Sequence, residues 1–375
     1  MMQKLKELLS HIENTIDKTR FDRLERLHAS ALDMRKVERL PVIASYPYPM
    51  DEKFVPFPHG EIFDDPEKML FNQLVSSFDS SVYLSEKIGD DLPVTVRADF
   101  GCVMIASMFG AVVEQVGDNP PWIRQNGHIS YENIIDISPT DFNRGIIAKV
   151  AARYQFYKDV LKDYPALSGV ANIVMPDLQG PVDNLELLIG SGIFEDMYLK
   201  RDLFLKAMDV VTQAQIELVK YFGKFVNSRT SGISFQHGFP LKGGLLIRDD
   251  TSIMVSPQMY RELIAPYDER LLEAFGGGIH SCGNVNGIVR EFISLRNTQC
   301  FDFGQSEMND VENIYQFAKM RDIPLIRVAV SQDELVTGSI MNKYPTGVSL
   351  IFRAASFENA KNVVEKYKTV CGCKE

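Results

Sequence analysis

The chain has 375 residues, of which 45% are hydrophobic and 24% are charged, a composition typical of a globular protein with a substantial core. Its 40 Lys and Arg residues against 50 Asp and Glu give a net charge of −10, and no basic stripe is present, which argues against a nucleic-acid partner. The five cysteines lack framework spacing, residues 1–20 lack the apolar core of a signal peptide, and no run approaches about 18 apolar residues. These features predict a cytoplasmic protein without a membrane partner.

Apolar residues recur at helical spacing over 3–36, and strand and helix patterns alternate from residue 40 onward. Strands are predicted at 41–48, 94–100, 167–175, 232–236, 277–281, 300–303, 325–330 and 348–352. Further helices are predicted at 64–90, 140–163, 183–196, 201–222, 257–275, 285–295, 310–321, 332–342 and 356–369.

This alternation indicates a parallel sheet, because parallel neighbours need long return connections. Both a doubly wound open sheet and a closed barrel fit the pattern, but a strand count near eight favours an α/β fold of the (β/α)8 TIM-barrel type. No GxGxxG or GxxxxGK[ST] motif follows an early strand, which argues against dinucleotide and nucleoside-triphosphate sites. The predicted domains are an N-terminal helical extension over 1–38 and the barrel over 39–375.

Polar side chains gather where the predicted strands stop, and in a parallel barrel those ends open onto one face. We predict that they converge there. The candidates for substrate binding are Asp99, Gln179, Gln236 and Gln305, and the candidates for catalysis are Asp177, His237 and Asp250.

His280 and Cys282 form the sharpest motif, because residues i and i+2 of a strand point to the same side. An imidazole and a thiolate so placed can bind zinc, which prefers nitrogen and sulfur ligands. The structural alternative is a buried, hydrogen-bonded histidine beside an inert cysteine. Open zinc sites usually have three protein ligands. Candidates for the third are Cys300, Cys371, Cys373, His237, Asp249 and Asp250, while Cys102 and Cys300 also fit small core residues.

Three stretches together resemble the uroporphyrinogen-decarboxylase-like superfamily: PDLQGPVDNLELLIG, LLIRDDTSIMVSPQMYRELIAPY and GGGIHSCGNV. The likeness runs over about 33–367 and implies a (β/α)8 barrel with an N-terminal helical extension. The superfamily includes porphyrinogen decarboxylases and cobamide-dependent methyltransferases.

Two features bear on the choice between these branches. The decarboxylases carry arginines in an early segment, where this chain has LPVIASYPYPMDEK without arginine. In the methyltransferase branch an H-x-C motif and a later cysteine hold a zinc that activates a thiol. His280 and Cys282 match the motif, but GVSLIFRAAS, near the predicted last strand, has no cysteine.

The resemblance therefore implies a methyltransferase that moves a methyl group between a small-molecule donor or acceptor and a cobamide cofactor, with zinc assistance. The corrinoid would be carried by a partner protein, and a homodimer is compatible with this interpretation. One alternative is a decarboxylase for another carboxylated substrate, in which Asp99 or Asp177 stabilises developing charge. A second alternative is a non-catalytic ligand-binding barrel.

Overall fold

The protein was analysed as a computed structural model that describes residues 1–78, 80–124 and 129–373. The N-terminal region predicted as one helix is two, α1 (Gln3–Thr15) and α2 (Lys18–Leu32). The break occurs at Ile16 and Asp17: the backbone leaves the helical conformation at Ile16, and the Asp17 carboxylate caps the second helix by accepting from the Thr19 amide. No helix among the described residues is long and apolar enough to cross a membrane.

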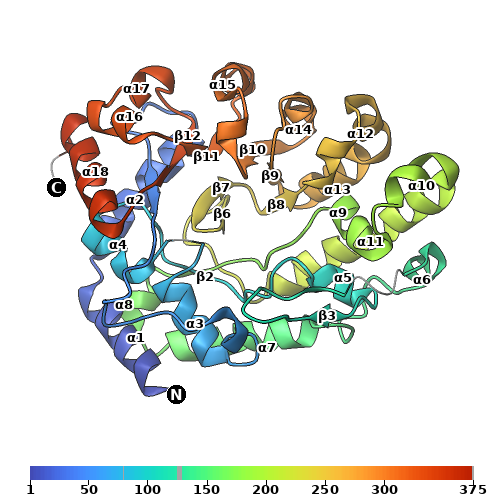
Figure 1. Ribbon diagram of the computed structural model, residues 1–375, viewed down its shortest axis with the longest axis horizontal. Coiled ribbons are helices and arrows are strands. Elements are labelled where there is room, and N and C mark those ends of the chain that lie inside the picture. The colour runs from blue at the N-terminus through green and yellow to red at the C-terminus, as the bar shows by residue number, and fades with distance from the viewer. Residues whose placement is uncertain (79, 125–128, 374–375) are drawn as a thin grey trace.

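The centre of the fold is a parallel sheet of six strands in the order β1-β12-β11-β10-β9-β8 (Figure 1). Its strands are β1 (Val42–Ser45), β8 (Leu245–Arg248), β9 (Gly277–Ser281), β10 (Thr298–Phe303), β11 (Leu325–Ala329) and β12 (Val348–Arg353). Two more parallel strands, β2 (Thr95–Val96) and β5 (Asn172–Ile173), pair with each other.

The two sheets are linked at both edges. A parallel bridge joins Gln179, which follows β5, to Arg248 of β8. On the other side, the Asp91 amide, just before β2, donates to the Val42 carbonyl of β1 at 2.9 Å. The eight parallel strands thus neighbour one another in chain order, an arrangement compatible with a TIM-barrel-like fold.

Helices lie outside the sheet and connect its strands (Figure 1). The first half contains α3 (Pro66–Val75), α4 (Val82–Ile88), α5 (Met104–Met108), α6 (Tyr131–Ile135), α7 (Ile147–Leu161), α8 (Pro165–Ser168), α9 (Pro181–Ile189), α10 (Ile193–Leu199) and α11 (Arg201–Phe222). The second half contains α12 (Pro257–Leu263), α13 (Ala265–Phe275), α14 (Val289–Ser294), α15 (Val311–Lys319), α16 (Gln332–Thr337), α17 (Ile340–Lys343) and α18 (Phe357–Val370). A short antiparallel pair, β3 (Val113–Glu114) and β4 (Trp122–Ile123), lies between α5 and α6.

One predicted strand of the parallel sheet is wrong. Residues Ile233–Gln236 form β6, which pairs antiparallel with β7 (Phe239–Lys242), and the fourth parallel strand is instead β8. The alternating pattern of β6 fits a hairpin strand as well as a barrel strand, and its turn, His237-Gly238, has positive φ at both residues (50° and 78°). The backbone of β6 therefore reverses at a tight turn instead of entering the sheet.

The β6–β7 hairpin lies on the concave side of the sheet (Figure 1). Phe239 and Leu241 of β7 belong to the same buried apolar cluster as Ile43 of β1, Leu246 of β8 and Ile326 of β11. The hairpin thus fills space enclosed by the strands and carries His237 at its tip.

A buried ion pair joins the N-terminal region to the start of the sheet. The Asp91 carboxylate accepts from Arg39 Nη2 at 2.7 Å and from the Val42 amide at 2.9 Å. Burial alone would raise the pKa of Asp91, but the Arg39 guanidinium and these hydrogen bonds outweigh it and lower that pKa. The pair's contribution to stability is therefore full at neutral pH and is lost as the pH falls below the ordinary carboxyl pKa of about 3.9 toward the lowered value.

We expect Asp91→Ala to reduce the free energy of unfolding by about 3–5 kcal/mol, because it leaves a buried guanidinium without its counter-ion. Urea denaturation at neutral pH measures this. The matched control is Asp159→Ala, which removes an exposed partner of Lys162 and should leave the midpoint unchanged. Equal effects of the two variants would contradict the assignment of a stabilising buried pair.

Candidate functional site

The ends of β8 and β9 bring three potential metal ligands together. His280 and Cys282 lie at the end of β9, and Asp250 is the second residue after β8. His280 Nε2 lies 3.4 Å from Cys282 Sγ and 3.8 Å from Asp250 Oδ1. Ligand atoms of all three residues lie within 4.8 Å of one another. Of the candidates for a third ligand, Asp250 is the one that the described structure places beside the pair.

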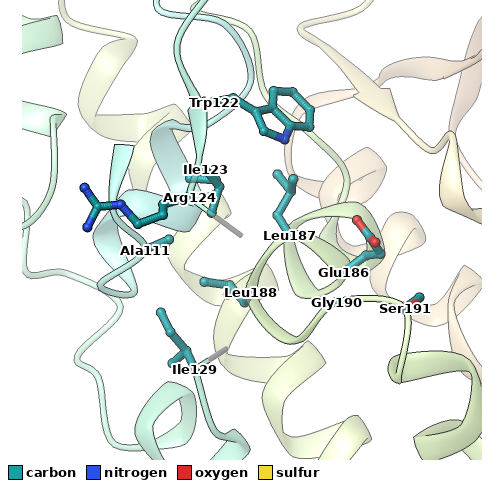
Figure 2. A pocket seen from close by; sticks show the side chains of 10 residues that line it. All are labelled: Ala111, Trp122, Ile123, Arg124, Ile129, Glu186, Leu187, Leu188, Gly190 and Ser191. Atoms are coloured by element: carbon teal, nitrogen blue, oxygen red, sulfur yellow. The ribbon is translucent and has the colours of Figure 1, made fainter. Parts of the chain in front are cut away.

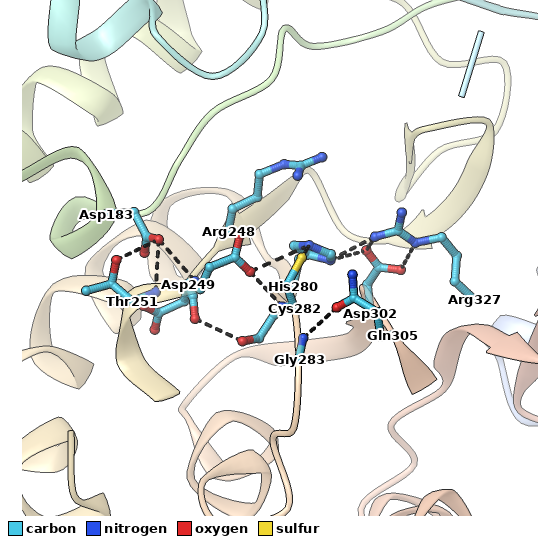
Figure 3. A network of polar contacts seen from close by, with 12 residues as sticks. Asp183, Arg248, Asp249, Thr251, His280, Cys282, Gly283, Asp302, Gln305 and Arg327 are labelled. Carbon is cyan, nitrogen blue, oxygen red and sulfur yellow. Dashed lines mark hydrogen bonds and ion pairs between the residues drawn. The ribbon is translucent and has the colours of Figure 1, made fainter. Parts of the chain in front are cut away.

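A second layer of contacts fixes the His280 ring (Figure 3). His280 Nδ1 lies 2.8 Å from Asp302 Oδ2 and also 2.8 Å from Arg327 Nη2, and Arg327 pairs with Asp302. A carboxylate only accepts hydrogen bonds, so we assign the ring proton to Nδ1, facing Asp302. Burial lowers the pKa of His280 despite the nearby carboxylate, so the ring is neutral. Its Nε2 lone pair therefore faces Cys282 and Asp250.

The donor set fits zinc. Ligand atoms bound to tetrahedral zinc at about 2.0–2.3 Å lie about 3.3–3.7 Å apart, close to the separations observed here. Burial and the neighbouring Asp250 carboxylate raise the pKa of the Cys282 thiol to about 12. The thiol is thus protonated at neutral pH unless a cation offsets the carboxylate. The Asp302–His280 contact is also the usual support of a metal-bound histidine.

Backbone contacts hold the three candidate ligands in place. Asp250 Oδ1 accepts from the Cys282 amide and Gln305 Oε1 accepts from the Gly283 amide, both at 2.6 Å. Gln305, predicted to bind substrate, therefore supports the turn after Cys282.

Behind Asp250, Asp183 Oδ1 accepts from the amides of Asp250 and Thr251 at 3.1 and 3.0 Å (Figure 3). Burial raises the pKa of Asp183 well above its usual range, aided by neighbouring carboxylates. The Asp183 carboxyl thus anchors the Asp250 backbone through these two hydrogen bonds.

Gly304 packs directly against Cys282. A Cβ atom built at Gly304 would lie 2.5 Å from Cys282 Sγ and 2.8 Å from Cys282 Cα. We expect Gly304→Ala to displace the thiol and to weaken zinc binding at least ~10-fold, the scale seen when ligand support is lost. Competition with a chelator measures this, with Gly287→Ala as the control because its Cβ would meet nothing within 4 Å. Unchanged zinc affinity in Gly304→Ala would contradict a ligand role for Cys282 in this position.

A second polar cluster surrounds Asp177, at the end of the β5 segment. Its carboxylate accepts from Gln236 Nε2 at 3.1 Å and pairs with Arg248, while Arg97 Nη1 lies at 3.5 Å. His237 Nε2 lies 4.0 Å away from it. The structure therefore brings Asp177, Gln236 and His237 together, but Gln236 and His237 reach the cluster from the β6–β7 hairpin and not from the end of a parallel strand.

Asp99 and Gln179 lie at the edges of this cluster. Asp99 pairs with Arg97 at 3.0 Å. Gln179 acts through its main chain, because its carbonyl accepts from Asn184 and Gln215 side chains. Their predicted roles in substrate binding stay predictions.

A pocket opens over the Asp177 cluster and is here called the Trp122 pocket. It has a volume of about 430 Å³ and is lined by residues that include Arg97, Asp177, Arg248, Phe78, Pro121 and Trp122. A separate hollow of about 400 Å³ lies on another side of Trp122, against Glu186 and Leu187 of α9 (Figure 2). None of the strand-end polar groups is among the described residues that line that second hollow.

The other cysteines lie elsewhere. Cys300 is wholly buried against the hairpin, with Sγ 3.5 Å from the Lys242 carbonyl. Cys373 lies in a hollow with Arg39 and Asp91, next to the N-terminal helices, and Cys371 packs against the main core.

Sequence reasoning missed three arginines of the site: Arg97, Arg248 and Arg327. Each sits at the end of, or inside, an otherwise apolar strand, and buried arginines are rare unless paired. A charged residue within an apolar run of the sequence was the feature that could have identified these arginines as residues of the site.

No protein-family model and no curated protein matches the chain. Among solved structures, the fold is similar to that of a methyltransferase from Methanosarcina mazei, with a TM-score of 0.63. The two share 17% sequence identity over 92% of this chain and 98% of that chain. At this identity the similarity establishes a common fold over nearly the whole length of both chains.

Proposed function

We propose that the chain is a zinc-assisted methyltransferase that moves a methyl group between a small substrate and a cobamide cofactor carried by a partner protein. The observation that carries the proposal is the convergence of Asp250, His280 and Cys282, whose ligand atoms lie within 4.8 Å at the strand ends. The fold shared with the methyltransferase from Methanosarcina mazei supports it. We further infer that the eight parallel strands close into a (β/α)8 barrel of the uroporphyrinogen-decarboxylase-like type.

Bound zinc would act as a Lewis acid that lowers the pKa of a coordinated thiol or polarises a departing oxygen. His280 would bind it through Nε2, oriented by Asp302, and Cys282 and Asp250 would complete the protein ligands. This set contains one sulfur, one nitrogen and one oxygen, and Asp250 stands in for the late cysteine that the sequence lacks. Arg327 neutralises Asp302 and so keeps the negative charge of the second layer small.

The decarboxylase alternative is less well supported by the charges at the strand ends. Binding a substrate carboxylate calls for an unpaired cation, whereas Arg97 and Arg248 face Asp99 and Asp177, and Arg327 faces Asp302.

The proposal is tested by incubating the zinc-loaded protein with cob(I)alamin and methyl donors, here methanol, dimethyl sulfide and anisole. We expect at least one donor to give methylcobalamin, followed by its absorbance, and removal of zinc to abolish the conversion. A protein that purifies without metal and converts none of the donors would contradict the proposal.

A further inference from the structure

The Trp122 pocket has uncovered aromatic walls. Phe78 is 45% exposed and Trp122 is 47% exposed, although both are large apolar side chains. The Arg97 guanidinium lies 4.5 Å from the Phe78 ring centroid, and the His237 ring meets Phe78 edge-on at 3.7 Å. A pocket of this size, with aromatic and proline walls, fits one substituted ring better than a long chain.

His237, at the hairpin tip, lies behind the wall of the pocket, next to Phe78 and Asp177, and its polar atoms have no partner among the described residues. Its side chain is 6% exposed, and neither ring nitrogen makes a hydrogen bond to any residue that the structure describes. Buried polar atoms are nearly always satisfied, so an unsatisfied imidazole points to a bound group. Nε2 and Asp177 Oδ2 are 4.0 Å apart, too far for a direct hydrogen bond but suited to one oxygen between them.

The charges around this position favour an uncharged group. Arg97 faces Asp99 and Arg248 faces Asp177, so the two arginines are balanced by two carboxylates. Some of their buried N–H groups have no hydrogen-bond partner among the described residues and can donate to a neutral oxygen. Burial and the nearby Arg248 lower the pKa of His237, so that its ring is neutral and offers one donor and one acceptor. A hydroxyl can donate to the Asp177 carboxylate and accept from the imidazole at once.

We propose that the Trp122 pocket binds a small hydroxylated aromatic molecule, whose hydroxyl bridges His237 and Asp177 and whose ring packs against Phe78 and Trp122. In this proposal the β6–β7 hairpin positions His237, which has a positive φ, against the substrate. The inference rests on the proposed function, because this molecule is the body of the methyl donor or acceptor. Arg248 links the Trp122 pocket to the candidate zinc site, because it lines the pocket and is the partner of His280 in the pairing of β8 with β9.

Trp122 is the only tryptophan of the chain, and because it also lines the hollow against α9, the His237 variants below assign a fluorescence change to the Trp122 pocket. The metal-free protein is titrated with phenol, toluene and benzoate, with excitation at the red edge of tryptophan absorption. We expect saturable binding of phenol, and affinities for toluene and benzoate at least ~10-fold weaker, about the effect of one hydrogen bond. The titration is done without metal. Absence of phenol binding therefore does not contradict methyl transfer, and absence of methyl transfer does not contradict phenol binding.

His237→Gly, which suits the positive φ, should lower phenol affinity ~10-fold without changing toluene affinity. His237→Asn, which also tolerates positive φ, should recover part of the loss. Thermal unfolding checks that the hairpin still folds. The proposal is overturned if wild-type protein binds phenol and toluene equally, if benzoate binds more tightly than phenol, or if folded His237→Gly binds phenol normally. Absence of any saturable change in wild-type fluorescence would overturn it as well.

Discussion

Cys282→Ala is expected to lose zinc and, with it, methyl transfer to cob(I)alamin. The change removes the one sulfur ligand from a set of three, while the small side chain leaves the β9 backbone undisturbed. Loss of a supporting group alone typically costs about 10- to 100-fold in metal affinity, so loss of a ligand should cost more than ~100-fold. Zinc content after dialysis and the rate of methylcobalamin formation are the measurements.

Cys300→Ala is the matched control for Cys282→Ala. Cys300 is also a cysteine on a neighbouring strand, and sequence alone made it a candidate ligand, but its thiol faces the hairpin carbonyl of Lys242. We expect Cys300→Ala to keep its zinc. Zinc retention in Cys282→Ala, or zinc loss in Cys300→Ala, would show that the metal is held elsewhere.

Asp302→Asn is expected to weaken zinc binding by about 10- to 100-fold although Asp302 is not a ligand. An amide can donate to His280 Nδ1 as readily as it can accept from it, so the proton is no longer fixed there and Nε2 is protonated in part of the molecules. Zinc binding must then return the ring to the tautomer with the proton on Nδ1, and because this shift releases no net proton, the affinity should fall by a similar factor at every pH at which the ring is neutral. Chelator competition across a pH series measures the change.

Arg327 provides the control that separates positioning from stability. Both Asp302→Asn and Arg327→Gln disrupt the buried ion pair, and we expect each to lower the free energy of unfolding by about 3–5 kcal/mol. Only Asp302→Asn frees the histidine proton, so Arg327→Gln should retain most of its zinc affinity. If both variants lose zinc in proportion to their lost stability, Asp302 acts only on the fold.

Seven of the eight predicted parallel strands lie where the alternation of strands and helices placed them. The exception is residues 232–236, because the alternating pattern of β6 fits a barrel strand as well as a hairpin strand, and only the His237-Gly238 turn distinguishes the two. The space enclosed by the sheet accepts β7 through contacts with β1, β8 and β11, which are distant in sequence. Local patterns do not contain that information.

The candidate site, like the fold, was predictable from the sequence only in part. The i, i+2 spacing of His280 and Cys282 predicted that their side chains lie together, and their polar atoms are 3.4 Å apart. Asp250 was one of six candidates for the third ligand. The parallel pairing of β8 with β9 brings both Asp249 and Asp250 close to the pair, but the Asp249 carboxylate accepts from the Ser252 hydroxyl and only Asp250 joins the ligand group. The arginine partners Arg248 and Arg327 could not be assigned, since each pairs with a carboxylate from another part of the sheet, Asp177 and Asp302 respectively.

X-ray absorption spectroscopy at the zinc edge tests the central claim most directly, because it counts the sulfur ligands. The Asp250–His280–Cys282 site predicts about one zinc per chain with a single sulfur at about 2.3 Å and nitrogen or oxygen ligands at about 2.0–2.1 Å. In Asp250→Ala the sulfur signal should persist while zinc affinity falls. Two or more sulfur ligands, or a protein that binds no zinc at all, would contradict the site described here.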